Sequence, residues 1–438
     1  MGRKDLMRIV IEPTKEAWAE LIKRPTRDFV KTERIVEPIL DKVKRNGDKA
    51  LRKFIREYDH VDIENILISQ EEILKSVKEV GKALKGAITS AKKNIQKFHE
   101  AQITKDIEIE TIPGVICNRK SVPIKKIGFY IPGGTAPLFS TVLMLGVPAR
   151  IAGCEEIIIC TPTNSEGKIN PVILYTAHLL GIEKIAKVGG AQAIAAMAYG
   201  TESIPRVDKI FGPGNQFVTV AKQIVSRDSV AIDMPAGPSE VLVVAGKKSN
   251  PTFVAADLLS QAEHGVDSQV VLISKSKKFI KDVLSEIDKQ VERLPRRDLV
   301  LKALANSLII VIKDKSTISD FINKYAPEHL IVALRKPEAI VQDVYNAGSV
   351  FIGDYTPEAA GDYASGTNHT LPTSGWARAI GGVSLDSFIK KITYQTISPS
   401  GLQALGPVIE KMAEAELLEA HKNAVSIRLK YLKENGPS

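Results

Sequence analysis

The runs Lys126-Ile127-Gly128-Phe129-Tyr130-Ile131 and Glu156-Ile157-Ile158-Ile159-Cys160 decide the fold class of this chain. Both are short and apolar, and the residues between them have a helical pattern, which is typical of a βαβ unit with parallel strands. Outward from this unit, further strand candidates occur at 184–188, 230–233, 241–245, 269–274, 308–312, 329–333 and 349–352. We therefore predict two α/β domains, with Gly237-Pro238 as the hinge between them.

Helices are predicted on both flanks of these strands. Between about residues 28 and 100, apolar residues recur at steps of three and four, as in Val36, Ile39, Leu40 and Val43. We expect these N-terminal helices to pack on the second domain or to join the two domains. After about residue 384 the pattern becomes helical again, and it ends in the Glu-, Lys-, Ala- and Leu-rich stretch 413–433.

The composition describes a soluble protein that folds by burial. Of the 438 residues, 44% are hydrophobic and 25% are charged, which excludes a disordered or collagen-like chain. The three cysteines are too few for a disulfide framework or a four-thiolate zinc site, so a reducing, cytoplasmic location is expected. No apolar run approaches the roughly 18 residues of a membrane span, and we expect no membrane partner.

The net charge of +9 leaves an acidic partner open. Residues 1–100 hold most of the excess, with 23 basic and 17 acidic residues interleaved, and such mixing is typical of solvated helix faces. Aromatic residues make up 5% of the chain and do not alternate with the basic ones, as they would in a platform for stacking bases. No nucleic-acid partner is expected.

Three glycine-containing loops each lie between a strand and a helical run. They are Tyr130–Thr135, Gly189–Gln192 and Phe211–Asn215, and neither G-x-G-x-x-G nor a P-loop is present. Glycine lets backbone amides approach a ligand, and helix N-termini favour anions, so three such loops in one domain indicate a nucleotide crevice. Tight turns without a ligand remain the alternative for any one loop.

Polar residues in the second half of the chain could assemble a reactive site. Gln261 and His264 are three apart at a helix end and could share a metal ion. Glu328 and His329 start a strand and could exchange protons near neutral pH. The polar loop 361–369 contains Asp362 and His369, whereas Glu416 and His421 fit a solvated helix face on spacing alone. A dehydrogenase and a zinc-dependent hydrolase both remain possible.

At these same residues the chain resembles the histidinol dehydrogenase family, zinc- and NAD-dependent enzymes that close histidine biosynthesis. The resemblance runs over essentially the whole chain and is carried by residues 128–154, 188–196 (VGGAQAIAA), 208–215 (DKIFGPGN), 231–240 (AIDMPAGPSE), 257–265 (DLLSQAEHG), 326–330 (APEHL), 361–373 (GDYASGTNHTLPT) and 420–425 (AHKNAV). It implies two successive NAD-dependent oxidations of L-histidinol, through bound L-histidinaldehyde to L-histidine.

The resemblance also implies roles for individual residues. The catalytic acid–base pair would be Glu328 and His329. One Zn²⁺ per subunit would be bound by Gln261, His264, Asp362 and His421. NAD, two molecules per turnover, would contact Tyr130, Gln192 and Asn215. The substrate would contact Ser239, Gln261, His264, His329, Asp362, His369, Glu416 and His421.

The fold that the resemblance implies has two Rossmann-like, doubly wound α/β domains of the aldehyde-dehydrogenase-like kind and a helical tail used in dimerisation. The expected boundaries are an N-terminal extension at 1–27, a larger domain at 28–128 and 239–383 with the zinc, substrate and catalytic residues, a smaller NAD-binding domain at 129–238, and the tail at 384–438. The protein would be a homodimer whose active sites are shared, with Glu416 and His421 coming from the other subunit.

The cysteines could matter because aldehyde oxidation can proceed through a thiohemiacetal on a Cys nucleophile. Cys117 and Cys154 fall in segments where the family has cysteines. Cys154 has no His beside it in the sequence to activate a thiolate, so a small buried apolar role is favoured over a nucleophilic one.

Overall fold

The computed structural model describes residues 6–25, 29–133, 137–235 and 237–436. Contacts divide the chain into two compact units, which are described separately: Met1–Ala101 with Ile124–Ser387, and Gln102–Pro123 with Phe388–Ser438. None of the described helices is both long enough and apolar enough to span a membrane.

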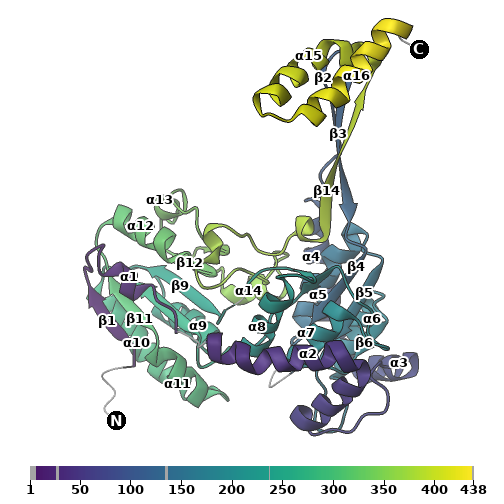
Figure 1. Cartoon of the computed structure of the whole chain (residues 1–438). Coiled ribbons are helices and arrows are strands. Elements are labelled where there is room, and N and C mark those ends of the chain that lie inside the picture. The colour runs from purple at the N-terminus through teal and green to yellow at the C-terminus, as the bar shows by residue number, and fades with distance from the viewer. Residues whose placement is uncertain (1–5, 26–28, 134–136, 236, 437–438) are drawn as a thin grey trace. The chain divides into compact units, whose positions relative to one another are not determined.

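The first series of predicted strands forms a five-stranded parallel sheet in the first unit (Figure 1). Its order is β6-β5-β4-β7-β8, with bounds β4 (Lys126–Tyr130), β5 (Glu156–Cys160), β6 (Lys184–Ala186), β7 (Lys209–Phe211) and β8 (Ala231–Ile232). Sequence periodicity did not indicate β7, which is three residues long. Because the chain returns past β4 to form β7, the order reverses between these two strands, and ligands bind at such switch points in open α/β sheets.

Helices before and within this series cover the five-stranded sheet. The connecting helices are α5 (Phe139–Ala152), α6 (Pro171–Leu179), α7 (Gly190–Tyr199) and α8 (Gln216–Val225). The helices predicted for 28–100 are confirmed as α2 (Phe29–Phe54), α3 (Gln70–Glu79) and α4 (Lys82–Glu100), with a short π-helical turn, η1, at Ile55–Asp59.

The N-terminal helices pack on the helices that cover the five-stranded sheet. The apolar stripe of α2 shares a core with α7 and α8, while α3 contacts α6 and α4 contacts α5. Packing on the second domain was expected instead, but α4 also joins the two domains as expected, since Asn94 donates to the carbonyl oxygen of Ala364 at 2.9 Å. The helical pattern identifies which face of a helix is buried, but not the surface against which it is buried. The domain boundaries remain a proposal, and these contacts favour assigning 29–100 to the smaller domain.

The second series of strands forms a six-stranded parallel sheet, also in the first unit. Its order is β1-β11-β10-β9-β12-β13, with bounds β1 (Arg8–Ile11), β9 (Glu240–Ala245), β10 (Gln269–Ile273), β11 (Leu308–Val311), β12 (His329–Ala333) and β13 (Ser349–Ile352). Without β1, this order has the same pattern as that of the five-stranded sheet. The first strand in sequence, β9, is central, the next two lie on one side of it, and the last two lie on the other. β1, inside the expected N-terminal extension, pairs with β11 at the sheet edge.

Alternate residues of the central strand β9 face two separate cores. Val241 and Val243 pack with α9 (Pro251–Ala262), α10 (Lys277–Val291) and α11 (Arg297–Ala305). Leu242 and Val244 pack with α1 (Trp18–Leu21), α12 (Lys315–Tyr325) and α13 (Glu338–Val341). Helices therefore cover both faces of the sheet, and the predicted class of two doubly wound α/β layers is confirmed. The remaining short helices of this unit are α14 (Glu358–Tyr363), η2 (Trp376–Arg378) and η3 (Leu385–Phe388).

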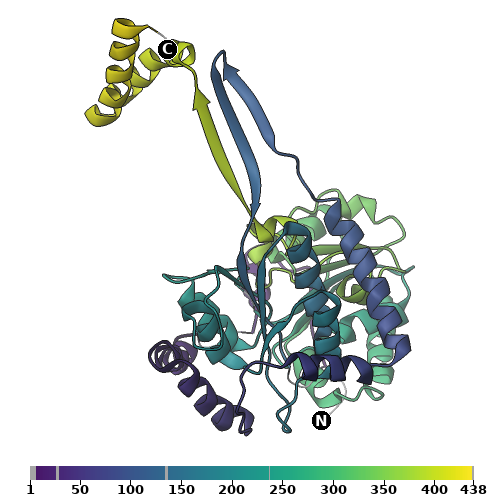
Figure 2. The ribbon, with the colours of Figure 1, turned by 90° about the vertical axis from the view of Figure 1, so that its right-hand side faces the viewer.

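The second unit contains a three-stranded antiparallel sheet and two helices (Figure 2). The strands, in the order β14-β3-β2, are β2 (Ile107–Ile112), β3 (Val115–Pro123) and β14 (Ile389–Ile397), and the helices are α15 (Pro399–Ala415) and α16 (Glu419–Asn435). The expectation of helix from about residue 384 is wrong for β14. That stretch, IKKITYQTI, is rich in β-branched residues, which favour strands, and it pairs along its length with β3.

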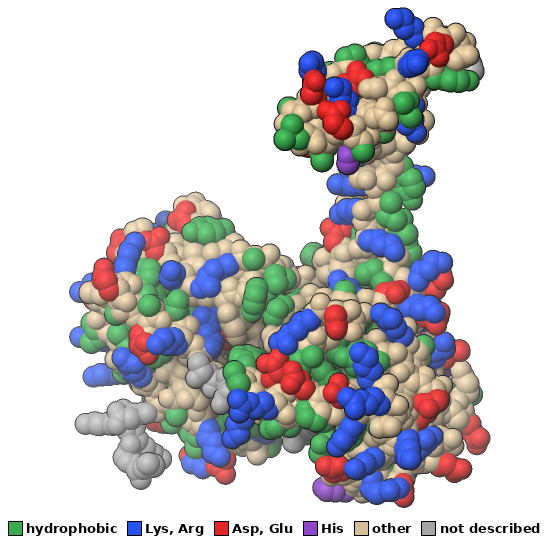
Figure 3. All heavy atoms as spheres, in the orientation of Figure 1, with side chains coloured by type: hydrophobic (Ala, Val, Ile, Leu, Met, Phe, Trp, Pro, Cys, Tyr) green, Lys and Arg blue, Asp and Glu red, His purple; other side chains and the backbone are tan. Residues whose placement is uncertain are grey.

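Charged side chains of both signs are interspersed over the face of the molecule drawn in Figure 3. Exposed ion pairs of the described residues include Lys15–Asp320 and Arg56–Asp62, each with side chains more than half exposed. This agrees with the expectation that the excess positive charge lies on solvated faces.

Candidate active site

The expected acid–base pair lies at the amino end of the six-stranded sheet. Glu328 directly precedes β12 and His329 is its first residue, and both side chains are buried. Nδ1 of His329 is 3.6 Å from Oε2 of Glu328. His329 lies opposite Val241 of β9 and Ser349 of β13, so the pair sits beside the central strand of the sheet.

The end of α9 brings a second group of side chains to the same place. This helix runs back from the carboxyl end of β9 to the amino edge of the sheet. Gln261 is fully buried there, and its Nε2 is 3.4 Å from Oε2 of Glu328 and 3.5 Å from Nδ1 of His329. His264, just beyond the helix end, is exposed and contributes to the cluster through its ring.

The short helix α14 adds two carboxylates, one of which the sequence analysis missed. Nε2 of His329 is 3.7 Å from Oδ1 of Asp362, and its Nδ1 is 3.7 Å from Oε1 of Glu358, which is 1% exposed. The ligand atoms of His264, Glu358 and Asp362 all lie within 4.8 Å of one another. A spacing of four residues places Glu358 and Asp362 on one helix face, and that spacing is the signal that could have identified Glu358.

The electrostatics of the cluster are dominated by these carboxylates. Burial alone lowers the pKa of His329, but Glu328, Glu358 and Asp362 outweigh it and hold the pKa well above the ordinary 6.5. Burial raises the pKa of Glu358 to about 8. For Asp362 burial acts in the same direction, but the nearby His329 ring prevails and lowers its pKa. A bound cation would favour the ionised form of Glu358 and offset the repulsion between the acidic groups around His329.

Unsatisfied polar atoms support the same conclusion. Oε1 of Gln261, Oε2 of Glu358 and Nε2 of His329 are buried and have no hydrogen-bond partner among the described residues. A buried polar atom without a partner costs about 1–3 kcal/mol, so such atoms call for a ligand or an ion. Imidazole nitrogen and carboxylate oxygen are ordinary donors for Zn²⁺. The donor set of His264, Asp362, Glu358 and the amide oxygen of Gln261 therefore fits a divalent metal ion.

The three glycine loops converge at the switch point of the five-stranded sheet. The hydroxyl of Tyr130, at the end of β4, accepts a hydrogen bond of 3.2 Å from the backbone N–H of Gly190. Gly212, after β7, has φ +120°, and a Cβ there would lie 2.1 Å from the carbonyl oxygen of Tyr130. Glycine is required at this approach. Gly134 and Thr135, part of the first predicted loop, lie outside the described residues.

A buried ion pair that the sequence analysis missed holds the third loop in place. The ammonium group of Lys222 on α8 donates to Asp233 and, at 2.9 Å, to the carbonyl of Gly212. Asp233 in turn accepts a hydrogen bond of 2.7 Å from the backbone N–H of Gly212. The side chains of Lys222 and Asp233 are 3% and 1% exposed. A loop that is held in place and whose glycine backbone a ligand can approach closely fits the binding of a dinucleotide.

The other residues expected to contact NAD lie at helix starts beside these loops. Gln192 is buried in the first turn of α7, next to Gly190. Asn215 caps α8, its Oδ1 accepting hydrogen bonds from the backbone N–H groups of Phe217 and Val218. Their contacts with NAD stay predictions.

The remaining residues expected to contact substrate differ in their surroundings. Ser239 directly precedes β9, next to the cluster. The ring of His369 already has partners on both sides, since Nδ1 is 2.9 Å from the carbonyl oxygen of Asp362 and Nε2 is 3.2 Å from the hydroxyl of Thr141. Glu416 and His421 are exposed residues of the second unit, at the end of α15 and in α16.

Two of the three cysteines are buried thiols. Cys154 is 3% exposed, and burial raises the pKa of its thiol to about 12. Burial also raises the pKa of Cys160, whereas Cys117 lies partly exposed in β3 of the second unit. A thiol protonated near neutral pH is a poor nucleophile, which supports the apolar role expected for Cys154.

The Cys154→Ala variant should keep its turnover within about twofold of the parent, because a thiol held neutral by burial does not supply a thiolate. Steady-state NADH formation from histidinol, with thermal unfolding as the check on folding, measures this. A folded Cys154→Ala protein that oxidises the alcohol but not the aldehyde would contradict the expectation and point to a thiohemiacetal.

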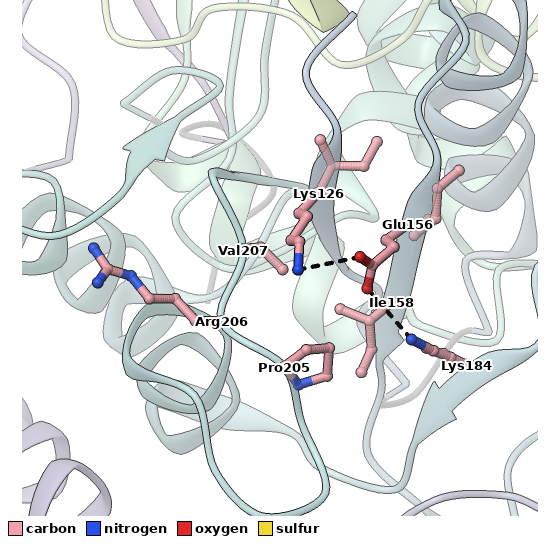
Figure 4. Close-up of a pocket in the computed structure, with 9 residues that line it drawn as sticks. Lys126, Glu156, Ile158, Lys184, Pro205, Arg206 and Val207 are labelled. Atoms are coloured by element: carbon pink, nitrogen blue, oxygen red, sulfur yellow. Dashed lines mark hydrogen bonds and ion pairs between the residues drawn. The ribbon is translucent and has the colours of Figure 1, made fainter.

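A separate shallow hollow lies at the amino edge of the five-stranded sheet, where β4, β5 and β6 begin (Figure 4). Glu156 lies between Lys126 and Lys184, with ion-pair distances of 3.1 and 3.4 Å. All three side chains are substantially exposed, and such pairs contribute about 0–1 kcal/mol. This edge is opposite to the glycine loops, and its charges satisfy one another, so it is not the candidate site.

Comparisons with known proteins identify the family over nearly the whole chain. The family model described as histidinol dehydrogenase matches residues 22–429. A histidinol dehydrogenase of Bacteroides thetaiotaomicron is 56% identical over 428 residues, covering 98% of this chain and all of the relative. One of Campylobacter jejuni is 51% identical, covering 94% of this chain and 96% of the relative.

A solved structure extends the similarity to three dimensions. The crystal structure of histidinol dehydrogenase from Elizabethkingia anophelis superimposes with a TM-score of 0.95 at 52% identity, covering 98% of this chain and 99% of that one. Full-length agreement at this identity covers both the parallel sheets and the chain segments that form the cluster around His329. The chain therefore belongs to the histidinol dehydrogenase family.

Proposed function

We propose that this protein oxidises L-histidinol to L-histidine in two successive NAD-dependent steps, with L-histidinaldehyde kept bound between them and one Zn²⁺ per subunit. The observation that carries the proposal is the cluster in which His264, Glu358 and Asp362 converge beside the buried His329 and Gln261. Membership of the histidinol dehydrogenase family favours a dehydrogenase over a zinc-dependent hydrolase. No observation on the described residues favours the hydrolase.

The bound groups supply the parts of the chemistry that the side chains lack. When bound at Gln261, His264 and Asp362, with His421 as the fourth proposed ligand, Zn²⁺ would serve as a template that holds the imidazole nitrogen and the amine of histidinol. When bound at the glycine loops, NAD supplies the hydride acceptor for both oxidations. We propose Tyr130, Gln192 and Asn215 as its contacts.

In the first oxidation, His329 accepts the proton of the substrate hydroxyl as the carbon loses hydride. Its ring is fixed for this task between Glu328 and Glu358 on one side and Asp362 on the other. Ser239, His369 and Glu416 are proposed to complete the contacts with substrate. General base catalysis of this kind contributes roughly 10²–10⁴-fold to the rate.

In the second step, Glu328 activates a water molecule that adds to the bound aldehyde, and His329 removes a proton from the hydrate as the second hydride leaves. Retaining the aldehyde in a buried site keeps a reactive carbonyl away from amines in solution. The two residues thus differ in task, because His329 acts in both oxidations and Glu328 acts in one.

The decisive measurement is a coupled assay with metal analysis. Two NADH and one histidine should form for each histidinol consumed, with about one zinc per chain. Zinc-loaded, folded protein that gives no rise in NADH absorbance with histidinol and NAD would overturn the proposal.

A homodimer with shared sites is proposed from the second unit. Helix α16 has no buried residue within the described chain, and Met412, Leu417, Ile427 and Tyr431 are each more than half exposed. Exposed apolar side chains in such number are typical of a protein interface. We propose a second copy of this chain as the partner that covers them and receives His421 and Glu416 in its site.

Mixing inactive Asp362→Ala and His421→Ala chains should regenerate activity. In a heterodimer, one of the two shared sites then has both Asp362 and His421, and the other has neither. The mixture is compared with each variant refolded alone, and heterodimer formation is checked by tagging one chain. Proven heterodimers that stay inactive would mean that both residues act within one chain.

A further inference from the structure

A buried arginine from the segment before α2 binds the carboxylate next to the acid–base pair. Nε of Arg24 is 2.7 Å from Oε2 of Glu240, and its Nη2 is 2.9 Å from Oε1, so the pair is bidentate. Arg24 also donates to the carbonyl oxygens of Ile22 and Tyr325, each at 2.8 Å, and its guanidinium lies 3.6 Å from the centre of the Tyr325 ring. These contacts hold the guanidinium in one orientation.

Glu240 is joined to Glu328 by two reciprocal hydrogen bonds. The backbone N–H of Glu240 donates to Oε2 of Glu328 at 2.9 Å, and the backbone N–H of Glu328 donates to Oε1 of Glu240 at 3.3 Å. The carbonyl oxygen of Glu240 is 3.4 Å from Nδ1 of His329. The amino ends of β9 and β12 are therefore tied together at the residues that carry the proposed proton chemistry.

The charge of Arg24 makes this arrangement possible. Glu240 and Glu328 are carboxylates that share a buried site, and like charges at short range repel. Arg24 is 11% exposed and keeps its positive charge at any physiological pH. It therefore compensates the negative charge of Glu240 where that carboxylate accepts the hydrogen bond from the backbone N–H of Glu328. Without the guanidinium, Glu240 would lose the partner that fixes both of its oxygens.

We propose that Arg24 and Glu240 are positioning residues for Glu328, which makes the segment before α2 part of the active-site framework rather than a simple extension. This inference rests on the proposed role of Glu328 as the group that activates water. It assigns to Arg24 a function in the second oxidation without any contact with substrate.

The test compares the two half-reactions in Arg24→Lys and Arg24→Ala, supplying histidinol in one assay and histidinaldehyde in the other. Arg24→Ala should slow aldehyde oxidation by roughly ten- to hundredfold, because a misplacement of about 1 Å can cost a factor of 10². Alcohol oxidation should slow less. Arg24→Lys keeps the charge but loses the bidentate fork and should fall between Arg24→Ala and the parent. Millimolar guanidinium should partly restore Arg24→Ala.

Two control variants alter the same segment without touching Glu240. Trp18, 4% exposed, packs edge-to-face on Phe321, and Lys15 pairs with Asp320 on the surface. Trp18→Leu should lower the unfolding temperature, and Lys15→Gln should barely alter it, but neither should change the ratio of the two half-reactions. A change of that ratio in Trp18→Leu equal to that in Arg24→Ala would reduce Arg24 to a purely structural residue and overturn the inference.

Glu328→Gln, measured alongside, separates this inference from the proposed role of Glu328. If Glu328→Gln slows both oxidations equally, the proposed division of labour fails. The inference about Arg24 then requires that its variants also slow both oxidations equally, by a smaller factor than Glu328→Gln does. The inference falls if folded Arg24 variants leave unchanged the half-reactions that Glu328→Gln slows. If Arg24→Ala does not fold, Arg24→Lys decides alone, and parental rates in the half-reactions that Glu328→Gln slows overturn the inference.

Discussion

Removal of the proposed divalent cation should reduce histidinol oxidation to background, and added Zn²⁺ should restore it. Without a cation, Glu328, Glu358 and Asp362 surround His329 and hold its pKa well above 6.5, which favours the protonated ring that cannot accept a proton. Dialysis against a chelator, followed by NADH assays before and after metal addition, measures this. Circular dichroism of the metal-free protein shows whether the fold is retained.

A variant distinguishes loss of this ion from damage by the chelator. Asp362→Asn keeps the shape of the side chain but removes the charge of a proposed ligand. It should lower zinc affinity by at least roughly 10–100-fold, because altering even the residues around the ligands of a metal typically costs that much. Asp320→Asn, on the exposed surface, is the matched control and should bind zinc like the parent. Full turnover in a sample shown to be free of metal would refute the metal role.

His329→Ala should slow both oxidations by roughly 10²–10⁴-fold, because it removes the proposed general base from each. Glu328→Gln should spare the oxidation of histidinol to the aldehyde more than the oxidation of the aldehyde. Single-turnover experiments with histidinol and with histidinaldehyde separate the two steps. The difference arises because only the second oxidation requires an activated water.

Glu328→Gln keeps the side-chain shape, and one oxygen can still accept the hydrogen bond from the backbone N–H of Glu240. Its unfolding temperature should therefore stay near that of the parent, which makes it a sharper test than an alanine. Equal losses in the two half-reactions, in a folded Glu328→Gln protein, would contradict the assigned division between Glu328 and His329.

The α/β class followed from the sequence because buried parallel strands are short, apolar and separated by helices. Five of the six strands in the larger sheet and four of the five in the smaller sheet lie where the apolar runs predicted them. In these two sheets, β1 and β7 lack a predicted apolar run because they are four and three residues long, too short to show a period. The longer strands β2 and β3 of the second unit were not predicted either. β14 was mistaken for helix because its neighbours on the C-terminal side are helical.

The candidate site was only partly within reach of the sequence. Motif resemblance supplied Gln261, His264, Glu328, His329 and Asp362, and the structure brings these five together. Spacing within one segment can relate Gln261 to His264, but it cannot relate either of them to Asp362, which is about a hundred residues away. Such pairings depend on which strand lies beside which, and that is decided by sheet order.

The sequence by itself determined the two series of parallel strands, the glycine loops and the family, since these depend on local pattern and on motifs that keep their order. Tertiary structure alone decided that α2 packs on the smaller sheet, that Glu358 joins Asp362 beside His329, and that Arg24 reaches Glu240. The physical reason is that burial and charge compensation act between residues distant in the chain. A buried carboxylate acquires its partner from the folded surroundings, and its own segment does not show which residue that partner will be.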